Sequence, residues 1–186
     1  MHLYIQNVNL FKKLILPFAL LLIIMGATTV AKVLWQENKP LTKQHFKGPV
    51  DTKSKFMSNT NTTLNIRIVK QRGVTAEVTN YFDPAKSWIK PNATNEILKH
   101  EQLHFDITEI YARELRKRVK HLQKNTSDAD VLNMEIKSAF KQYARLMEKE
   151  QTRYDTETNH SIIVDMQKKW SDSVAIRLIG LNEFKK

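Results

Sequence analysis

The periodicity of the apolar residues changes once along this chain, near residue 95, and the change limits the fold classes open to it. Before this point, the segments 63–69 and 74–78 alternate between apolar and polar residues. Such alternation is typical of a β-strand with one buried face. Because Gly73 between them suits a turn, we expect the two segments to form an antiparallel hairpin. The segment 80–91, rich in aromatic and turn-forming residues, is predicted to be a loop.

From Asn95 onward, the apolar residues recur at steps of three and four, as they do on one face of a helix. Asn125 and a polar loop at 154–161 divide this part of the chain into three predicted helices. The second helix is expected to bury Val131, Met134, Ile136, Phe140, Tyr143 and Met147, and the third to bury Ile162, Ile163, Met166, Trp170, Val174 and Leu178. Strands followed by helices predict an α+β fold, in which a small antiparallel sheet packs on about three helices.

An uncharged apolar run, LILPFALLLIIMGATTVA (14–31), lies between Lys13 and Lys32. Its length is at the border between a signal-peptide core and a membrane-spanning helix, and it is apolar on all faces. The lysines before the run are expected to stay on the cytoplasmic side. We therefore expect residues 1–36 to be a signal peptide or membrane anchor, and residues 37–186 to form one domain outside the cytoplasmic membrane. Cleavage and anchoring both remain open.

The composition excludes several kinds of site. The chain has no cysteine, so it has neither disulfides nor a thiolate metal site, and a transition metal would be held by His, Asp or Glu. The net charge of +11 would suit a polyanionic partner, but the basic residues are interleaved with glutamates along helices. No recognisable nucleic-acid-binding motif is present, so no nucleic-acid partner is expected.

The first predicted helix carries the motif His100-Glu101-Gln102-Leu103-His104, an HExxH sequence. At about 100° per residue, His100 and His104 lie about 40° apart on the helix, so both can bind one metal ion. Glu101 lies beside them, where a carboxylate can act as general base toward a metal-activated water. The pattern predicts a Zn²⁺ site.

Two histidines make half of a catalytic zinc site, which needs a third protein ligand and an open position for water. The extended motifs HExxHxxGxxH and HExxHxxE, which supply this ligand from the same chain segment, are absent. Ile107 stands where they have Gly or Glu, and Ile110 stands where the first has its third His. Asp106 lies about 200° from His104 around the helix and cannot share the metal. The third ligand is therefore expected from a later element.

The favoured source is the polar segment 154–161, which gathers Tyr154, Asp155, Glu157 and His160. We predict that His160 is the third zinc ligand, because imidazole binds zinc without adding charge. Asp155 would then hydrogen-bond a ligand histidine or would itself be the ligand. Glu135 on the second helix is the other alternative. Tyr154 is a candidate for donating a hydrogen bond to the developing oxyanion.

The segments HEQLHFDITEIYARELRKRV (100–119), SWIK (87–90) and YDTETNH (154–160) resemble the DUF922 family, and the resemblance extends from about Leu41 to the C-terminus. It implies a bacterial, secreted, zinc-dependent protease. Two glycines of the family pattern are replaced here, by Leu103 and Ser161. Leu103 occupies an unspecified position of the metal motif, so metal binding is expected to survive.

Together these patterns predict an exported or anchored zincin-like metallohydrolase, with a peptide or protein as substrate. One strand of the 63–78 hairpin is expected to align the substrate by backbone pairing. The rival hypotheses are an envelope protein with a structural or relic metal site, and a basic module that binds polyanions. The oligomeric state is left open.

Overall fold

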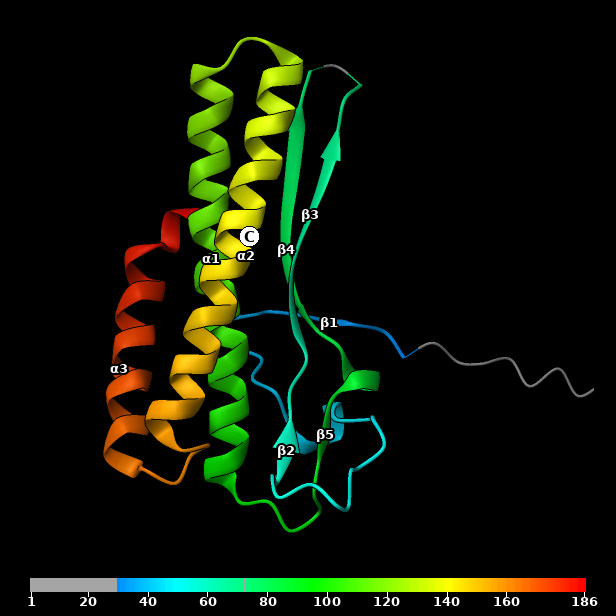
Figure 1. Ribbon diagram of the computed structural model, residues 1–186, viewed down its shortest axis with the longest axis vertical. Helices are drawn as coiled ribbons and strands as arrows, with labels where there is room; N and C mark the ends of the chain where they lie inside the picture. The colour runs from blue at the N-terminus through cyan, green and yellow to red at the C-terminus, as the bar shows by residue number, and fades with distance from the viewer. Residues whose placement is uncertain (1–29, 72) are drawn as a thin grey trace, which may run out of the picture.

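A computed structural model describes residues 30–71 and 73–186 of the chain (Figure 1). Most of the predicted export segment, up to residue 29, lies outside the described residues. The elements in chain order are β1 (Val33–Leu34), β2 (Ser58–Asn59), β3 (Thr62–Val69), β4 (Thr75–Phe82), β5 (Trp88–Ile89), α1 (Asn95–Asn125), α2 (Ala129–Thr158) and α3 (Val164–Gly180), with short 3-10 turns between some of them. The predicted α+β class, with three helices and small antiparallel sheets, is confirmed. Within the described part, no helix is both long and apolar enough to cross a bilayer.

The predicted hairpin is present as β3 and β4, which pair antiparallel with Ile66 opposite Val78. β1 pairs with the other edge of β4, and β2 and β5 form a separate two-stranded sheet. The prediction of a loop at 80–91 is wrong at both ends, because β4 continues to Phe82 and β5 follows. The alternation continues through a buried polar residue, Asn80, whose amide donates to the Phe105 carbonyl oxygen at 3.1 Å. The predicted strand 74–78 therefore ends too early, because it was defined by the alternation of apolar residues alone.

The long helices α1 and α2 lie side by side and antiparallel, with the β3–β4 hairpin along one side and α3 along the other (Figure 1). The large core lies between the hairpin and these helices, and Ile107, Ile110 and Ile136 are completely buried in it. This arrangement places the start of α1, the end of α2 and the start of α3 at the same end of the molecule.

Part of the predicted apolar stripe of α2 faces solvent instead. Met134 is 61% exposed, and Leu132 and Ile136 face the core. Met134 lies two residues, or about 200°, from Ile136 around the helix, so the two cannot share a buried face. Before α3, Ile162 is 71% exposed, because it belongs to the loop and not to the helix.

The polar segment 154–161 is not a loop along its whole length, since α2 continues to Thr158. The Thr158 hydroxyl donates to the Tyr154 carbonyl oxygen at 2.7 Å, and both side chains are completely buried. Tyr154 and Thr158 face the protein interior although their polar groups resemble those of an exposed loop.

The irregular segment before β2 contributes to a second, smaller core. Leu41 and Phe46 pack there with Phe82 and Phe105. Trp35 also packs against this cluster, and its indole Nε1 donates to Asp106 on α1 at 2.7 Å. Trp35 and β1 lie N-terminal to the predicted domain boundary at residues 36 and 37, so the described fold begins before that boundary.

Candidate metal centre

The first turns of α1 bring His100 and His104 to the same face, next to the end of α2. The His100 side chain is buried and that of His104 is 13% exposed, and their Nε2 atoms lie 3.2 Å apart. Their ring planes are nearly perpendicular, with centroids 4.8 Å apart. The i, i+4 spacing within one helix places both rings on the same face of α1.

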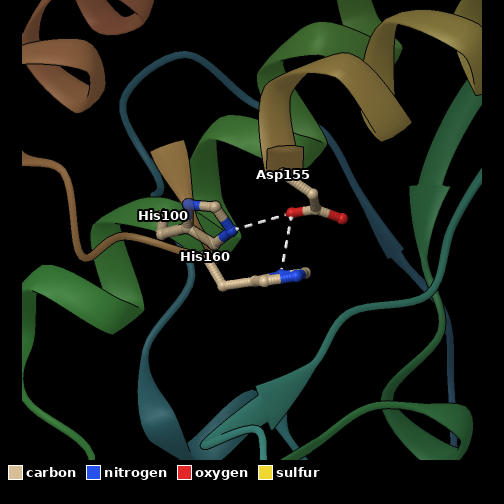
Figure 2. A group of neighbouring side chains, drawn as sticks. All are labelled: His100, Asp155 and His160. Atoms are coloured by element: carbon tan, nitrogen blue, oxygen red, sulfur yellow. Dashed lines mark hydrogen bonds and ion pairs between the residues drawn. The ribbon is translucent and has the colours of Figure 1, made fainter. Parts of the chain in front are cut away.

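Asp155, on the last turn of α2, completes the cluster. Its Oδ1 lies 3.1 Å from His100 Nε2, 2.9 Å from His104 Nε2 and 3.5 Å from His160 Nδ1. Figure 2 shows His100, Asp155 and His160, whose ligand atoms all lie within 4.8 Å of one another. One carboxylate oxygen therefore contacts three ring nitrogens that come from two different parts of the chain.

These distances suit a metal ion. With bonds of about 2.0–2.1 Å to nitrogen or oxygen, the ligand atoms of a tetrahedral zinc site lie about 3.3–3.4 Å apart. The three separations among His100 Nε2, His104 Nε2 and Asp155 Oδ1, from 2.9 to 3.2 Å, and the 3.5 Å from Asp155 Oδ1 to His160 Nδ1 are close to that value, whereas His160 lies within 4.8 Å of His100. Imidazole nitrogen and carboxylate oxygen are also the donors that zinc and related divalent metals bind. Both the spacing and the donor chemistry fit a single divalent ion.

The electrostatics of the cluster favour a cation. Burial raises the pKa of the Asp155 carboxyl, but hydrogen bonds from His100 and His104 outweigh burial and hold this pKa well below its ordinary value. Burial lowers the pKa of His104, but the hydrogen bond to Asp155 and the charge of Glu101 outweigh it, so that this pKa is raised. The lowered pKa of Asp155 and the raised pKa of His104 agree, because an ionised carboxylate stabilises positive charge at the ring nitrogens.

Glu101 is buried and lies on the wall of a cavity of about 530 Å³ beside the cluster. Its Oε1 accepts a hydrogen bond from the hydroxyl of Ser58 on β2. The cavity is lined by Lys55, Phe56, Met57, Ser58, Asn59, Thr60, Ile97, His100, Glu101, His104, Asp155, Asn159, His160, Ser161 and Ile162. Among the described residues, no member of β3 or β4 lines this cavity, so the strand beside it is β2 and not the predicted hairpin.

His160 reaches the cluster from a tight turn after α2. The residues Asn159, His160 and Ser161 all have positive φ angles, of 44°, 52° and 77°. The His160 backbone amide donates to the Asp155 carbonyl oxygen at 3.0 Å, and its ring lies 4.4 Å from that of Phe56. The His160 side chain is 43% exposed, whereas those of His100 and His104 on α1 are 4% and 13% exposed. His160 is therefore near the cluster but at its outer rim.

Tyr154 lies behind the histidines and not in the cavity. Its ring stacks on His100 with centroids 4.5 Å apart, and its side chain is completely buried. The hydroxyl is within 2.9 Å of Gln167 Oε1 and 3.3 Å of the His100 carbonyl oxygen. Burial raises the pKa of this phenol above its ordinary value. The structure does not bring the hydroxyl to the position that an oxyanion role would need.

Two other residues of the predicted set have different partners. Glu135 accepts a hydrogen bond from Thr126 at the turn between α1 and α2. It lies about 30 Å before Asp155 on the same helix, at roughly 1.5 Å per residue, and is therefore remote from the cluster. Glu157 accepts from the indole of Trp170 at 2.8 Å. Trp170 is buried in the core, as predicted.

Two glutamines contact the cluster and were not predicted. His104 Nδ1 lies 2.5 Å from Gln151 Oε1, and His100 Nδ1 lies 3.0 Å from Gln167 Oε1. Gln151 precedes Asp155 by four residues, so helical spacing places both on one face of α2 once Asp155 is known to face the site. Gln167 is on α3, and no local pattern distinguishes it.

The comparisons with known proteins give one match. The model of a family described as "Bacterial protein of unknown function (DUF922)" matches residues 56–161, more than half of the chain. The matched span includes the cavity-lining residues from Phe56 to Ser161 and the cluster of His100, His104, Asp155 and His160, but not Ile162 or Gln167. The matched span is narrower than the resemblance expected from the sequence, which extends from about Leu41 to the C-terminus. No curated protein and no solved structure matches.

Proposed function

This chain belongs to the DUF922 family, and we propose that it is an exported, zincin-like, zinc-dependent metallohydrolase that cleaves peptide or protein substrates. The observation that carries the proposal is the convergence of Asp155 Oδ1 on the Nε2 atoms of His100 and His104, beside a cavity that also exposes Glu101. A metal-ligand set, a carboxylate base and a space for substrate together are the components of a metal-assisted hydrolase.

We assign the fixed ligands as His100, His104 and Asp155, because all three lie on helices. His160 is the fourth group of the set, but it is partly exposed and held by a turn. A catalytic zinc site needs one position that water or substrate can occupy. His160 is the group that can leave that position free, since its displacement requires no change in a helix.

When bound, zinc would lower the pKa of a water molecule and polarise a carbonyl group. Glu101 would accept the proton of that water on its carboxylate and later pass it to the leaving amine. The Ser58 hydroxyl restricts the Glu101 side chain by donating to Oε1, so the base is held facing the cavity. Asp155 and the two histidines would hold the ion, while the buried ring of Tyr154 limits rotation of His100.

The cavity supports a peptide as substrate. Phe56, Met57 and Ile162 provide apolar contacts, and β2 contributes a strand that is paired with β5 on one edge. An extended peptide can add to the other edge of such a strand through its backbone groups.

The proposed export of the protein rests on the apolar run at residues 14–31, and N-terminal sequencing of the mature protein would separate a cleaved signal from a retained anchor.

The test pairs metal analysis with a digest of a broad peptide library, using Glu101→Gln and the matched control Glu96→Gln. Glu96 lies exposed in the first turn of the same helix. We expect about one zinc per chain in all three proteins. Loss of the general base should reduce turnover by about 10²- to 10⁴-fold in Glu101→Gln alone. Undiminished turnover in Glu101→Gln would reject this residue as the base.

A second candidate function, a structural metal site, is favoured by the presence of four ligating groups rather than three. A site closed by four protein ligands leaves no place for water. Zinc that raises the stability of the protein without any hydrolysis of the library would support this second function over the first.

A further inference from the structure

His100 and His104 each have an amide oxygen beside Nδ1, the ring nitrogen that faces away from Asp155. His104 Nδ1 lies 2.5 Å from Gln151 Oε1 on α2, and His100 Nδ1 lies 3.0 Å from Gln167 Oε1 on α3. The Nε2 atoms of the same rings face Asp155. Each imidazole is therefore held between a neutral amide on one side and the carboxylate on the other.

The orientation of the Gln151 amide follows from its other partners. Its Nε2 donates to the His104 carbonyl oxygen at 2.8 Å and lies 3.0 Å from the Thr108 hydroxyl. A carbonyl oxygen only accepts, so this end of the amide must be the NH₂ group. The other end is then the carbonyl oxygen, and His104 Nδ1 must be the donor toward it.

Gln167 is oriented by a short chain of hydrogen bonds that begins and ends at His100. Tyr154 Oη lies 3.3 Å from the His100 carbonyl oxygen and 2.9 Å from Gln167 Oε1, and either oxygen can accept its proton. The hydroxyl then accepts from Gln167 Nε2 at 2.7 Å. With the amide in this orientation, Gln167 Oε1 lies 3.0 Å from His100 Nδ1 and accepts from it, so that Nδ1 carries the proton.

We propose that Gln151 and Gln167 are positioning residues that keep a proton on Nδ1 of His100 and His104, so that Nε2, which donates to Asp155 in the free protein, is the nitrogen that gives up its proton and binds the metal. The proposal deepens the metal site of the proposed function and rests on it for the identity of the ion. A partner on the outer nitrogen fixes both the tautomer and the ring orientation of a metal-binding histidine.

The neutrality of both partners has a chemical consequence. A carboxylate at this place raises the basicity of the ligand imidazole, whereas an amide adds no charge. With two amides, the negative groups of the site are Asp155 and Glu101, both of which line the cavity. The ion would then keep more of its positive charge for the water and the substrate.

The test uses the full-length chain, kept in solution with a mild detergent, and two measurements. Competition with a chelator gives the zinc affinity, and NMR of ¹⁵N-labelled protein at neutral pH detects imidazole N–H protons on Nδ1 that are protected from exchange. The variants are Gln151→Leu and Gln167→Leu, which remove the acceptor, and Gln151→Glu and Gln167→Glu, which keep an acceptor oxygen. The matched control is Gln123→Leu, because Gln123 also lies on a helix and bonds a backbone carbonyl, that of Val74.

We expect each leucine variant to lose the protected Nδ1 proton of its own histidine and to bind zinc about 10- to 100-fold more weakly. The glutamate variants should recover the zinc affinity, and Gln123→Leu should match the wild type. Leucine variants with unchanged Nδ1 protection and unchanged affinity would overturn the positioning role while leaving the metal site intact.

Three further outcomes are also decisive. If the wild-type chain binds no zinc, the proposed function fails, but protected Nδ1 protons that vanish in the leucine variants would still support the positioning role. If Gln151→Leu does not fold, Gln167→Leu decides the question, because Gln167 is partly exposed in the first turn of α3. Absence of any protected Nδ1 proton in the wild type would contradict the proposal directly.

Discussion

Replacement of Asp155 by asparagine should nearly abolish zinc binding by the folded chain. The side chain keeps its size, but the oxygen that contacts three ring nitrogens loses its charge. A residue that merely orients a ligand typically contributes about 10- to 100-fold to metal affinity. A residue that binds the metal itself should contribute more, so we expect a decrease of over about 100-fold.

This difference can be read from thermal unfolding. At free zinc about 1,000 times its dissociation constant, the wild-type chain gains about 4.1 kcal/mol of stability. At the same zinc concentration, a site weakened by about 100-fold gains only about 1.4 kcal/mol. For a chain of this size, about 1 kcal/mol moves the Tm by roughly 2–4 °C. Zinc should therefore raise the Tm by about 8–16 °C in the wild type and by about 3–6 °C or less in Asp155→Asn.

The assay compares Asp155→Asn, His160→Ala and Glu135→Gln, each with zinc and with a chelator. Glu135→Gln is the control and should respond as the wild type does, because Glu135 lies at the turn between α1 and α2. His160→Ala should lose less than Asp155→Asn, since its nitrogen is the most distant of the three and is partly exposed. An undiminished zinc response in Asp155→Asn, with a lost response in His160→Ala, would refute the assignment of Asp155 as a fixed ligand.

Three other substitutions test Tyr154 and the packing of two glycines. Tyr154→Phe should cost about 1 kcal/mol of stability through its lost hydrogen bonds but change kcat by less than about tenfold; a decrease of about 10²- to 10³-fold would instead indicate an oxyanion donor. Gly48→Ala should destabilise the chain by about 1–3 kcal/mol, because the new Cβ would lie 2.8 Å from the Ser87 carbonyl oxygen. Gly180→Ala, with nothing within 4 Å, should be neutral or stabilising, and urea midpoints would show whether the two differ.

The elements that could be predicted from the sequence are those whose signal is local. The alternation around Ile66 and Val78 predicts the hairpin, because a period of two has one structural meaning over a short segment. The spacing of His100 and His104 likewise places both rings on one face before any tertiary contact is known. Neither inference depends on how the helices pack.

The rest of the site depends on tertiary contacts that no periodicity encodes. Asp155 lies 55 residues after His100, and its position on the inner side of the rings follows from the packing of α2 against α1. Gln167 is 67 residues away from His100 and belongs to a third helix. The segment around Thr158 has the composition of a loop, because polar side chains that face a buried site and those that face water look alike in sequence.

The distribution of the site over three helices also determines when it can form. In the unfolded chain, His100 and His104 are close in sequence, but Asp155 and Gln167 must be brought to them by closing long loops. Contacts of this range form late in folding, after the local helices. Zinc should therefore bind tightly only after α1, α2 and α3 have packed together, and it should then stabilise that packing. The rate at which tight zinc binding appears during refolding should report the completion of the tertiary structure.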